Sequence, residues 1–146
     1  MGYALFTARK LSLTTRLNNC NALLASNSER TNALTTSIFA KQSEADMKKI
    51  NANIKAYNEY EKAMDAAGDD EKKQNDAQTE LTTALNNAEK ESTMSNIRIQ
   101  MLQQQQNVLD QEKNRLETQL KAYQQELESV EKGEEAGIKS ATPKFS

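Results

Sequence analysis

The sequence has no histidine and no tryptophan, and it contains only one cysteine, one proline and four glycines. Without histidine the chain lacks the commonest general base and metal ligand. Catalysis by Ser-His-Asp or Cys-His groups is therefore excluded as well. A single cysteine excludes an intramolecular disulfide and a zinc site built from several cysteines. So few glycines also argue against a glycine-rich phosphate loop. These absences predict a non-enzymatic protein with no metal site and no organic cofactor.

Bulky apolar residues are scarce too, since 36% of the residues are hydrophobic and 5% are aromatic. A globular domain with a wide core contains more apolar mass than this. The formal net charge is only -2, so the strong self-repulsion of many disordered chains is missing. Alanine, leucine, glutamine, glutamate and lysine, which favour helices, dominate the composition. We therefore predict an all-α fold of long helices with narrow apolar stripes.

No apolar run approaches the roughly 20 residues of a transmembrane helix, so no transmembrane segment is expected. The first residues also lack the apolar stretch of a secretory signal peptide. Residues 1–28 contain arginine, serine and threonine but no acidic residue, which is also typical of a mitochondrial presequence. The compartment therefore stays open. Basic residues do not form a stripe with interleaved aromatics, so nucleic acid is not an expected partner.

The clearest interruption of the helical pattern is Gly68-Asp69-Asp70. Glycine is favoured just after a helix because it enters the left-handed conformation without strain. Aspartate is a good N-cap, and its charge suits the positive end of the next helix. We predict a first helix over 1–67, a turn at 68–70 and a second helix over 71–131. The simplest arrangement is an antiparallel helical hairpin, completed by oligomerisation.

The second helix carries a sustained heptad pattern, which is typical of a coiled coil. The predicted coiled-coil seam comprises Leu81, Leu85, Ala88, Ile99, Leu102, Leu109, Leu116, Leu120, Tyr123, Leu127 and Val130. Polar residues interrupt this seam at Ser92, Ser95, Gln106 and Lys113. Such polar layers set register and partner number while lowering stability.

The first helix is less regular. A first stripe runs from Leu13 to Ile38 in steps of four and three residues, with polar gaps at Asn27 and Thr31. Cys20 lies in this stripe, either buried as a small apolar residue or free to form an intermolecular disulfide. A capping box of Ser26 with Glu29 leaves a helix break near 25–28 as an open alternative.

The register of the first helix slips near 41–43. A second stripe follows that does not extend the first one, and a change of supercoil or of partner is expected there. The second stripe comprises Met47, Ile50, Ile54, Tyr57 and Met64. The helical signal fades after Val130, where two glycines and the only proline interrupt the chain. We predict a loosely structured tail over 132–146, with Ile138 and Phe145 as candidate anchors.

The two ends of the chain differ in charge. Residues 1–28 contain three basic residues before any acidic one, whereas residues 126–135 contain five glutamates and one lysine. An antiparallel hairpin places Arg9 near Glu128 and joins these oppositely charged segments. Surface ion pairs contribute only about 0–1 kcal/mol each, so they select this arrangement more than they stabilise it.

A further apolar flank lies beside the seam of the second helix at Met94, Ile97, Met101 and Val108. It either widens the stripe beneath the first helix or contacts another subunit or partner, a role that adaptable methionine suits. An isolated hairpin buries little surface, whereas ordering each residue costs about 1–2 kcal/mol. We expect a homo-oligomer or a helical protein partner. The leading interpretation is a self-assembling structural subunit of a bundle or filament; the alternative is a coiled-coil adaptor, tether or secretion chaperone.

The Asn-, Ser- and Thr-containing stretch from Leu11 to Ile38 and the heptads from Leu102 to Val130 resemble axial and filament subunits of flagellar and type III secretion systems. Those families fold as helical hairpins that assemble with their neighbours, and they lack a cleaved signal. The resemblance implies self-assembly and an extracellular location reached without signal cleavage; a cytoplasmic location is the alternative. It covers most of the chain in style only and transfers no functional residue. Cys20 and the tail after Gly133 depart from the pattern.

Overall fold

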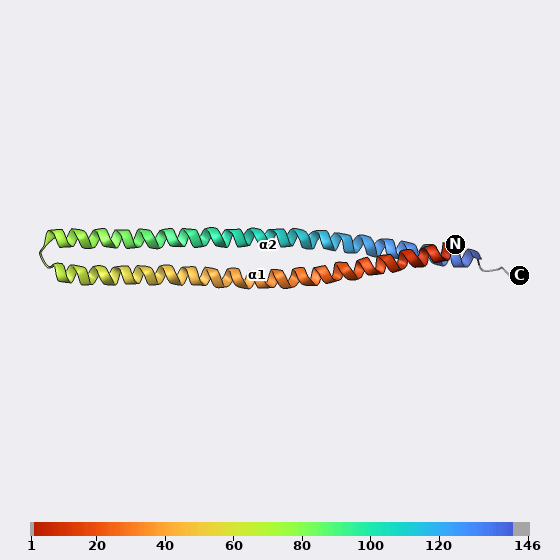
Figure 1. Ribbon diagram of the computed structural model, residues 1–146, viewed down its shortest axis with the longest axis horizontal. Coiled ribbons are helices and arrows are strands. Elements are labelled where there is room, and N and C mark those ends of the chain that lie inside the picture. The colour runs from red at the N-terminus through yellow and green to blue at the C-terminus, as the bar shows by residue number, and fades with distance from the viewer. Residues whose placement is uncertain (1, 142–146) are drawn as a thin grey trace. The chain divides into compact units, whose positions relative to one another are not determined.

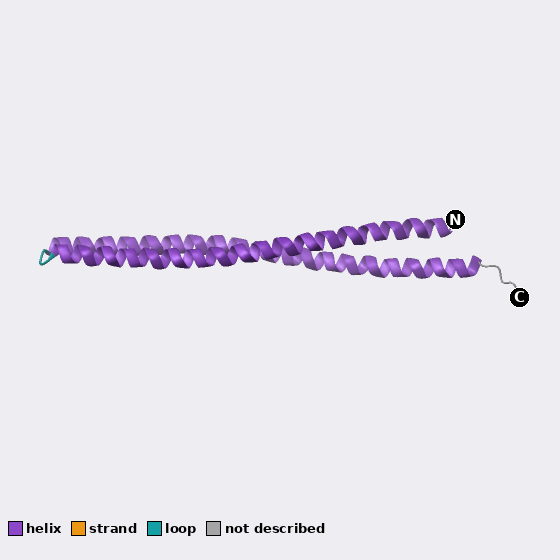
Figure 2. Cartoon of the chain, turned by 90° about the horizontal axis from the view of Figure 1, so that it is seen from below, coloured by secondary structure: helices purple, strands orange, loops and turns teal. Residues whose placement is uncertain are grey.

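The computed structural model describes residues 2–141 and the side chains of residues 3–137. It contains two helices, α1 (Gly2–Ala67) and α2 (Glu71–Ala141), and no strand among the residues it describes. The structure divides into a turn unit, residues 33–106, and a terminal unit, which combines residues up to 32 with residues from 107 onward. Within each unit α1 and α2 lie side by side (Figures 1 and 2). The predicted all-α helical hairpin is confirmed.

The end of α1 is set by Gly68, which has a φ of 55°. This left-handed conformation is open to glycine and strained for residues with a β-carbon. The Gly68 amide donates to the Met64 carbonyl oxygen at 3.3 Å, so the last turn of α1 keeps a hydrogen bond. The Gly68 carbonyl oxygen in turn accepts from the Gln74 side-chain Nε2 at 2.6 Å, which ties the turn to α2.

Asp70 begins α2 as its N-cap. Its Oδ1 atom accepts hydrogen bonds from the backbone amides of Lys72 at 3.1 Å and Lys73 at 3.3 Å. These amides belong to the first turn of the helix and have no partner within it. Asp69 is exposed and lies between the two turn-forming residues. The connection thus occupies the residues at which the sequence predicted a turn.

α1 is unbroken at residues 25–28, where a capping box had left a break as an alternative. Asn27, in this segment, is 1% exposed and points at α2. Its side-chain Nδ2 donates to the Leu109 carbonyl oxygen at 2.9 Å. This contact with the neighbouring helix stabilises the segment as helix, because tertiary packing outweighs a local capping signal.

α2 continues past residue 131, where the sequence predicted its end, as far as Ala141. The Phe6 ring of α1 packs against it there. A β-carbon built on Gly133 would lie 3.3 Å from this ring, and one on Gly137 would lie 3.7 Å from it. Because Gly133 and Gly137 have no side chains, the Phe6 ring can pack closely against α2. This packing offsets the low helix propensity of glycine. Phe145 and the side chain of Ile138 lie outside the described residues.

The terminal unit has an interior of bulky side chains. Leu13 and Cys20 of α1 and Leu109 and Leu116 of α2 are buried, and each fully buried leucine contributes about 1.5–3 kcal/mol. Cys20 is free and buried, and its thiol donates to the Leu116 carbonyl oxygen at 3.1 Å. Cys20 therefore occupies the first of the two environments expected for it, that of a small apolar residue in the seam.

Charged side chains line the same unit across the two helices. Arg9 pairs with Glu126, and Lys10 Nζ lies 3.8 Å from Glu131 Oε1. The Arg16 guanidinium lies over the Tyr123 ring, 5.9 Å from its centre, within reach of a cation–π attraction. The basic start of the chain thus meets the acidic part of α2 in the antiparallel sense.

The turn unit is built differently, because small residues form most of its seam. The buried side chains of this unit are Ile38, Ala56, Ala67, Ala77, Ala88 and Ile99. Four of these six side chains are alanines, so less apolar area is fully buried here than in the terminal unit. Several larger side chains of this part of α1 lie outside the seam, and they form the surfaces described next.

Candidate functional site

Four large apolar side chains of α1 face away from α2 in the turn unit. The α1 stripe, defined as Met47, Ile50, Ile54 and Tyr57, is exposed by 54%, 51%, 54% and 54% respectively. Its steps of 3, 4 and 3 residues place all four side chains on one face of a helix. The seam on the other side of α1 is continued by alanines such as Ala56. A change of partner near 41–43 stays a prediction, because α1 keeps facing α2 here through alanines that continue the phase of Ile38.

A second row lies on α2. The α2 stripe, defined as Met94, Ile97 and Met101, is exposed by 55%, 52% and 58%. Val108, which belongs to the terminal unit, is exposed by 62%. The structure therefore leaves all four residues of the predicted lateral flank in contact with solvent. They do not widen the seam beneath α1, which was the other interpretation of this flank.

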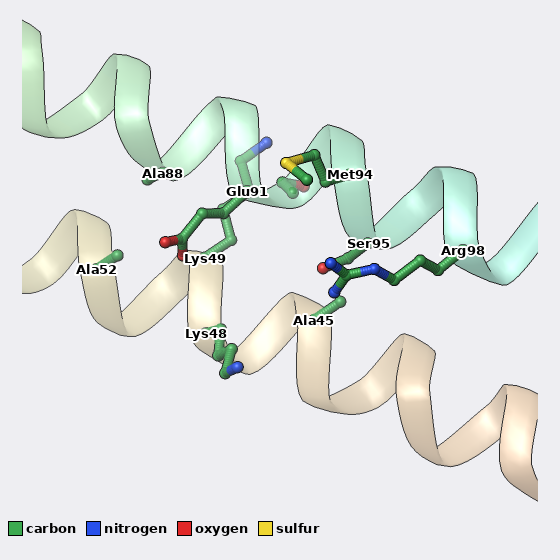
Figure 3. Close-up of a pocket in the computed structure, with 10 residues that line it drawn as sticks. Ala45, Lys48, Lys49, Ala52, Ala88, Glu91, Met94, Ser95 and Arg98 are labelled. Carbon is green, nitrogen blue, oxygen red and sulfur yellow. The ribbon is translucent and has the colours of Figure 1, made fainter.

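A shallow groove runs between the helices beside the α2 stripe. It encloses about 310 Å³, because small side chains at the seam leave room between the two backbones. Figure 3 shows alanines of both helices along its floor and Lys48, Met94 and Arg98 at its margins. The residues lining it are Ala45, Lys48, Lys49, Ala52, Ala88, Glu91, Ser92, Met94, Ser95 and Arg98.

The α1 and α2 stripes project toward opposite faces of the turn unit. One face carries the ion pair of Lys49 Nζ with Glu89 Oε2, at 2.9 Å, and the other face carries the groove. With a rotation of roughly 100° per residue, Ile50 and Tyr57 project outward on the ion-pair side. Met94 borders the groove. The turn unit therefore presents two separate apolar surfaces.

The predicted seam of α2 faces α1 along its length. Four of its residues are buried and seven are half-buried: the first group is Ala88, Ile99, Leu109 and Leu116, and the second is Leu81, Leu85, Leu102, Leu120, Tyr123, Leu127 and Val130. Among the expected polar layers, Gln106 Nε2 donates to Thr35 Oγ1 at 2.9 Å. Lys113 is exposed instead and lies 3.9 Å from Glu117 on its own helix, because a long charged side chain extends to water.

The alanine seam of α1 was not predicted from the sequence. Ala45, Ala52, Ala56, Ala63 and Ala67 follow one another in steps of 7, 4, 7 and 4 residues, which is a helical repeat. This signal was present but was masked by the larger residues of the α1 stripe, whose steps fit a helix equally well. Asn27, interpreted as a polar gap, is the other missed contact, because its burial depends on the opposing helix.

Within the described residues, no group of three or more histidine, cysteine, aspartate or glutamate side chains is placed to hold a metal ion. No helix of the described chain combines the length and the apolar character needed to cross a membrane.

The fold thus defines the chain as an antiparallel two-helix hairpin with exposed apolar stripes. No protein-family model, curated protein or solved structure matches it.

Proposed function

We propose that the protein is a structural subunit that self-assembles by helix–helix packing into a bundle or filament. The observation that supports this is the pair of stripes in the turn unit, in which seven large apolar side chains are each more than half exposed. Single exposed apolar residues are ordinary on protein surfaces. Contiguous rows of them, in helical spacing on both helices, are typical of protein–protein contact sites.

Because the seam of the turn unit is rich in alanine, covering the two stripes should add to the stability of the fold. An alanine buries little more than one methyl group, and burial of a methylene-sized group contributes only about 0.8 kcal/mol. Ordering a residue costs about 1–2 kcal/mol of backbone entropy. Covering a large side chain adds roughly 1.5–3 kcal/mol when it becomes fully buried. Association through the stripes therefore supplies stability that the alanine seam does not.

The opposite placement of the stripes favours an extended assembly. A subunit with one contact surface forms a closed pair, whereas a subunit with two surfaces on opposite faces can add neighbours on both sides. Repetition of the two contacts builds a chain of subunits, as in a filament. This geometry supports a filament over a discrete dimer.

A second candidate function is that of an adaptor, tether or secretion chaperone that holds a client helix. The groove beside Met94 favours it, because a helix lying along the groove covers Met94 and meets the cationic Lys48 and Arg98 at its margins. A client of this kind carries an apolar stripe flanked by acidic residues. In this case the hairpin stays single until the client is added.

Sedimentation velocity and electron microscopy of the full chain over a concentration series test the proposal. We expect larger species as concentration rises. Met101→Glu is expected to weaken assembly at least tenfold without loss of helicity, because a charge in a dry contact has no partner. Gln103→Glu adds the same charge at an exposed position of α2 outside the stripe and is the matched control. A monomer at every concentration would overturn self-assembly and favour the client-binding alternative.

A further inference from the structure

We propose that the α1 stripe is the contact between two copies of this chain, packed antiparallel about a two-fold axis. The inference rests on the proposed self-assembly and adds the surface, the partner and the orientation. The occupant of the stripe is the same stripe of a second copy. Three properties of α1 support this contact: the spacing of the stripe residues, the position of Glu61 and the area that the side chains expose.

The steps of 3, 4 and 3 residues in the α1 stripe read the same in both directions. Two antiparallel copies therefore place Met47 opposite Tyr57 and Ile50 opposite Ile54, so that all four layers are apolar on both sides. The α2 stripe lacks this property, because its corresponding fourth position is Gln104. Pairing of the α1 stripe with an α2 stripe leaves this glutamine facing an apolar layer, and a buried amide without a partner is unfavourable.

The same axis extends the contact beyond the four central layers. With this axis Phe39, exposed by 75%, lies opposite Asp65 of the second copy, beside the half-buried Met64. Glu44 comes beside Lys62 of the second copy, and both side chains are exposed. Each of these pairings occurs twice because the axis is two-fold. The contact therefore extends beyond the four central layers, with charged side chains along its edge.

The position of Glu61 favours the antiparallel orientation of the two copies over the parallel one. It lies on the same face as the α1 stripe, one helical turn beyond Tyr57. In a parallel pair in register, Glu61 of one copy faces Glu61 of the other, and like charges directly opposed are destabilising. In the antiparallel pair Glu61 faces Ser43, whose small side chain leaves the carboxylate in contact with water. The antiparallel orientation is therefore favoured.

The exposed area is sufficient for a specific but weak dimer. The four stripe residues and Phe39 together expose roughly 600 Å² per copy. A pair then buries about 1,200 Å², which lies at the lower limit of specific interfaces. We expect the α1 contact to dissociate on dilution, and Ile50→Glu should raise the dissociation constant of this contact at least tenfold.

Disulfide crosslinking tests the orientation directly. Full-length chains carrying Met47→Cys or Tyr57→Cys, each with Cys20→Ala, are oxidised alone and as an equal mixture, with one chain mass-labelled. A disulfide requires the two Cα atoms to approach within about 7 Å. The antiparallel contact satisfies this only between the two different variants. In either variant alone, the introduced thiols are separated by ten residues, or about 15 Å along the helix.

The expected result is a crosslinked pair of unlike chains in the mixture and none in either variant alone. Crosslinking of the Met47→Cys chain with itself would overturn the antiparallel contact in favour of a parallel one. Absence of any crosslink while wild-type protein still associates would overturn the use of the α1 stripe and leave the proposed self-assembly in place. Wild-type protein that stays monomeric at every concentration would defeat both.

Discussion

The side-chain Nδ2 of Asn27 in α1 donates a hydrogen bond to the carbonyl oxygen of Leu109 in α2 at 2.9 Å. Both residues lie 41 positions from Gly68 in the sequence. Cys20 and Leu116, which are hydrogen-bonded at 3.1 Å, each lie 48 positions from Gly68. The pairing in the terminal unit is thus that of a hairpin with equal arms. A shift of one helix along the other breaks both bonds, so the buried amide sets the register, as polar seam residues do in coiled coils.

Asn27→Ala should lower the free energy of unfolding by about 1–2 kcal/mol, because it removes this hydrogen bond and leaves a small cavity. Urea unfolding followed by far-UV circular dichroism measures the change. Asn18→Ala, at an exposed position nine residues earlier in α1, is the control and should stay within about 0.5 kcal/mol of the wild type. Equal effects of the two substitutions would show that the buried amide has no special role.

Exchanging the charges of Arg30 and Glu112 tests the antiparallel pairing of α1 with α2. The Arg30 guanidinium nitrogen donates to both carboxylate oxygens of Glu112 at 3.0 Å. Arg30→Glu should lower the unfolding free energy by about 0.5–1 kcal/mol, since these side chains remain partly exposed. Adding Glu112→Arg to the same chain should recover most of the loss at low salt. A double variant that is no more stable than the single one would contradict the pairing.

Gly68→Ala probes the turn. A β-carbon at a φ of 55° is strained, so the substitution should lower the unfolding free energy by about 1–2 kcal/mol. No heavy atom lies within 4 Å of the added β-carbon, so the effect reports backbone conformation and not a clash. Asp69→Ala, at the next residue of the same turn, should change stability by less than about 0.5 kcal/mol. Thermal unfolding of both variants distinguishes the two effects, and a neutral Gly68→Ala would contradict the left-handed turn.

The Cys20 thiol offers a chemical measure of seam packing. Its residue is 3% exposed, so a disulfide reagent should reach it only when the terminal unit opens. We expect the native chain to react at least about 100-fold more slowly than the chain in urea, because only the small unfolded fraction exposes the thiol. A Cys20→Ala chain carrying Asn18→Cys, at an exposed position of α1, should react rapidly without urea. Similar rates for the two native chains would argue against a buried Cys20.

Much of the fold follows from local sequence signals. Gly68 and Asp70 occupy the end of one helix and the beginning of the next because one tolerates the left-handed conformation and the other caps free amides. Leu109 and Leu116 fall on the heptad that predicted them as seam residues, and both are buried. The extension of α2 to Ala141 was not predictable in this way. It depends on the Phe6 ring, which meets Gly133 only once the chain has folded back.

The candidate site was predictable only in part. Met94, Ile97 and Met101 were separable from the α2 seam because they lie off the leucine heptad. In α1, the alanine set and the Met47 to Tyr57 set both fit helical spacing, and either can form a seam. Both sets of residues can therefore be identified in the sequence, but the sequence does not show which of them packs against α2.

The amino-acid sequence by itself determines that the chain is helical, that it turns at Gly68 and that opposite charges meet across the helices. These are properties of single residues, of their periodicity and of their distance from the turn. The tertiary structure decides which face of α1 meets α2. The phase of Ile38 continues into Ala45 and Ala52, so the small residues turn inward and the stripe from Met47 to Tyr57 turns outward. This choice depends on how two helices pack along their whole contact, which no local pattern contains.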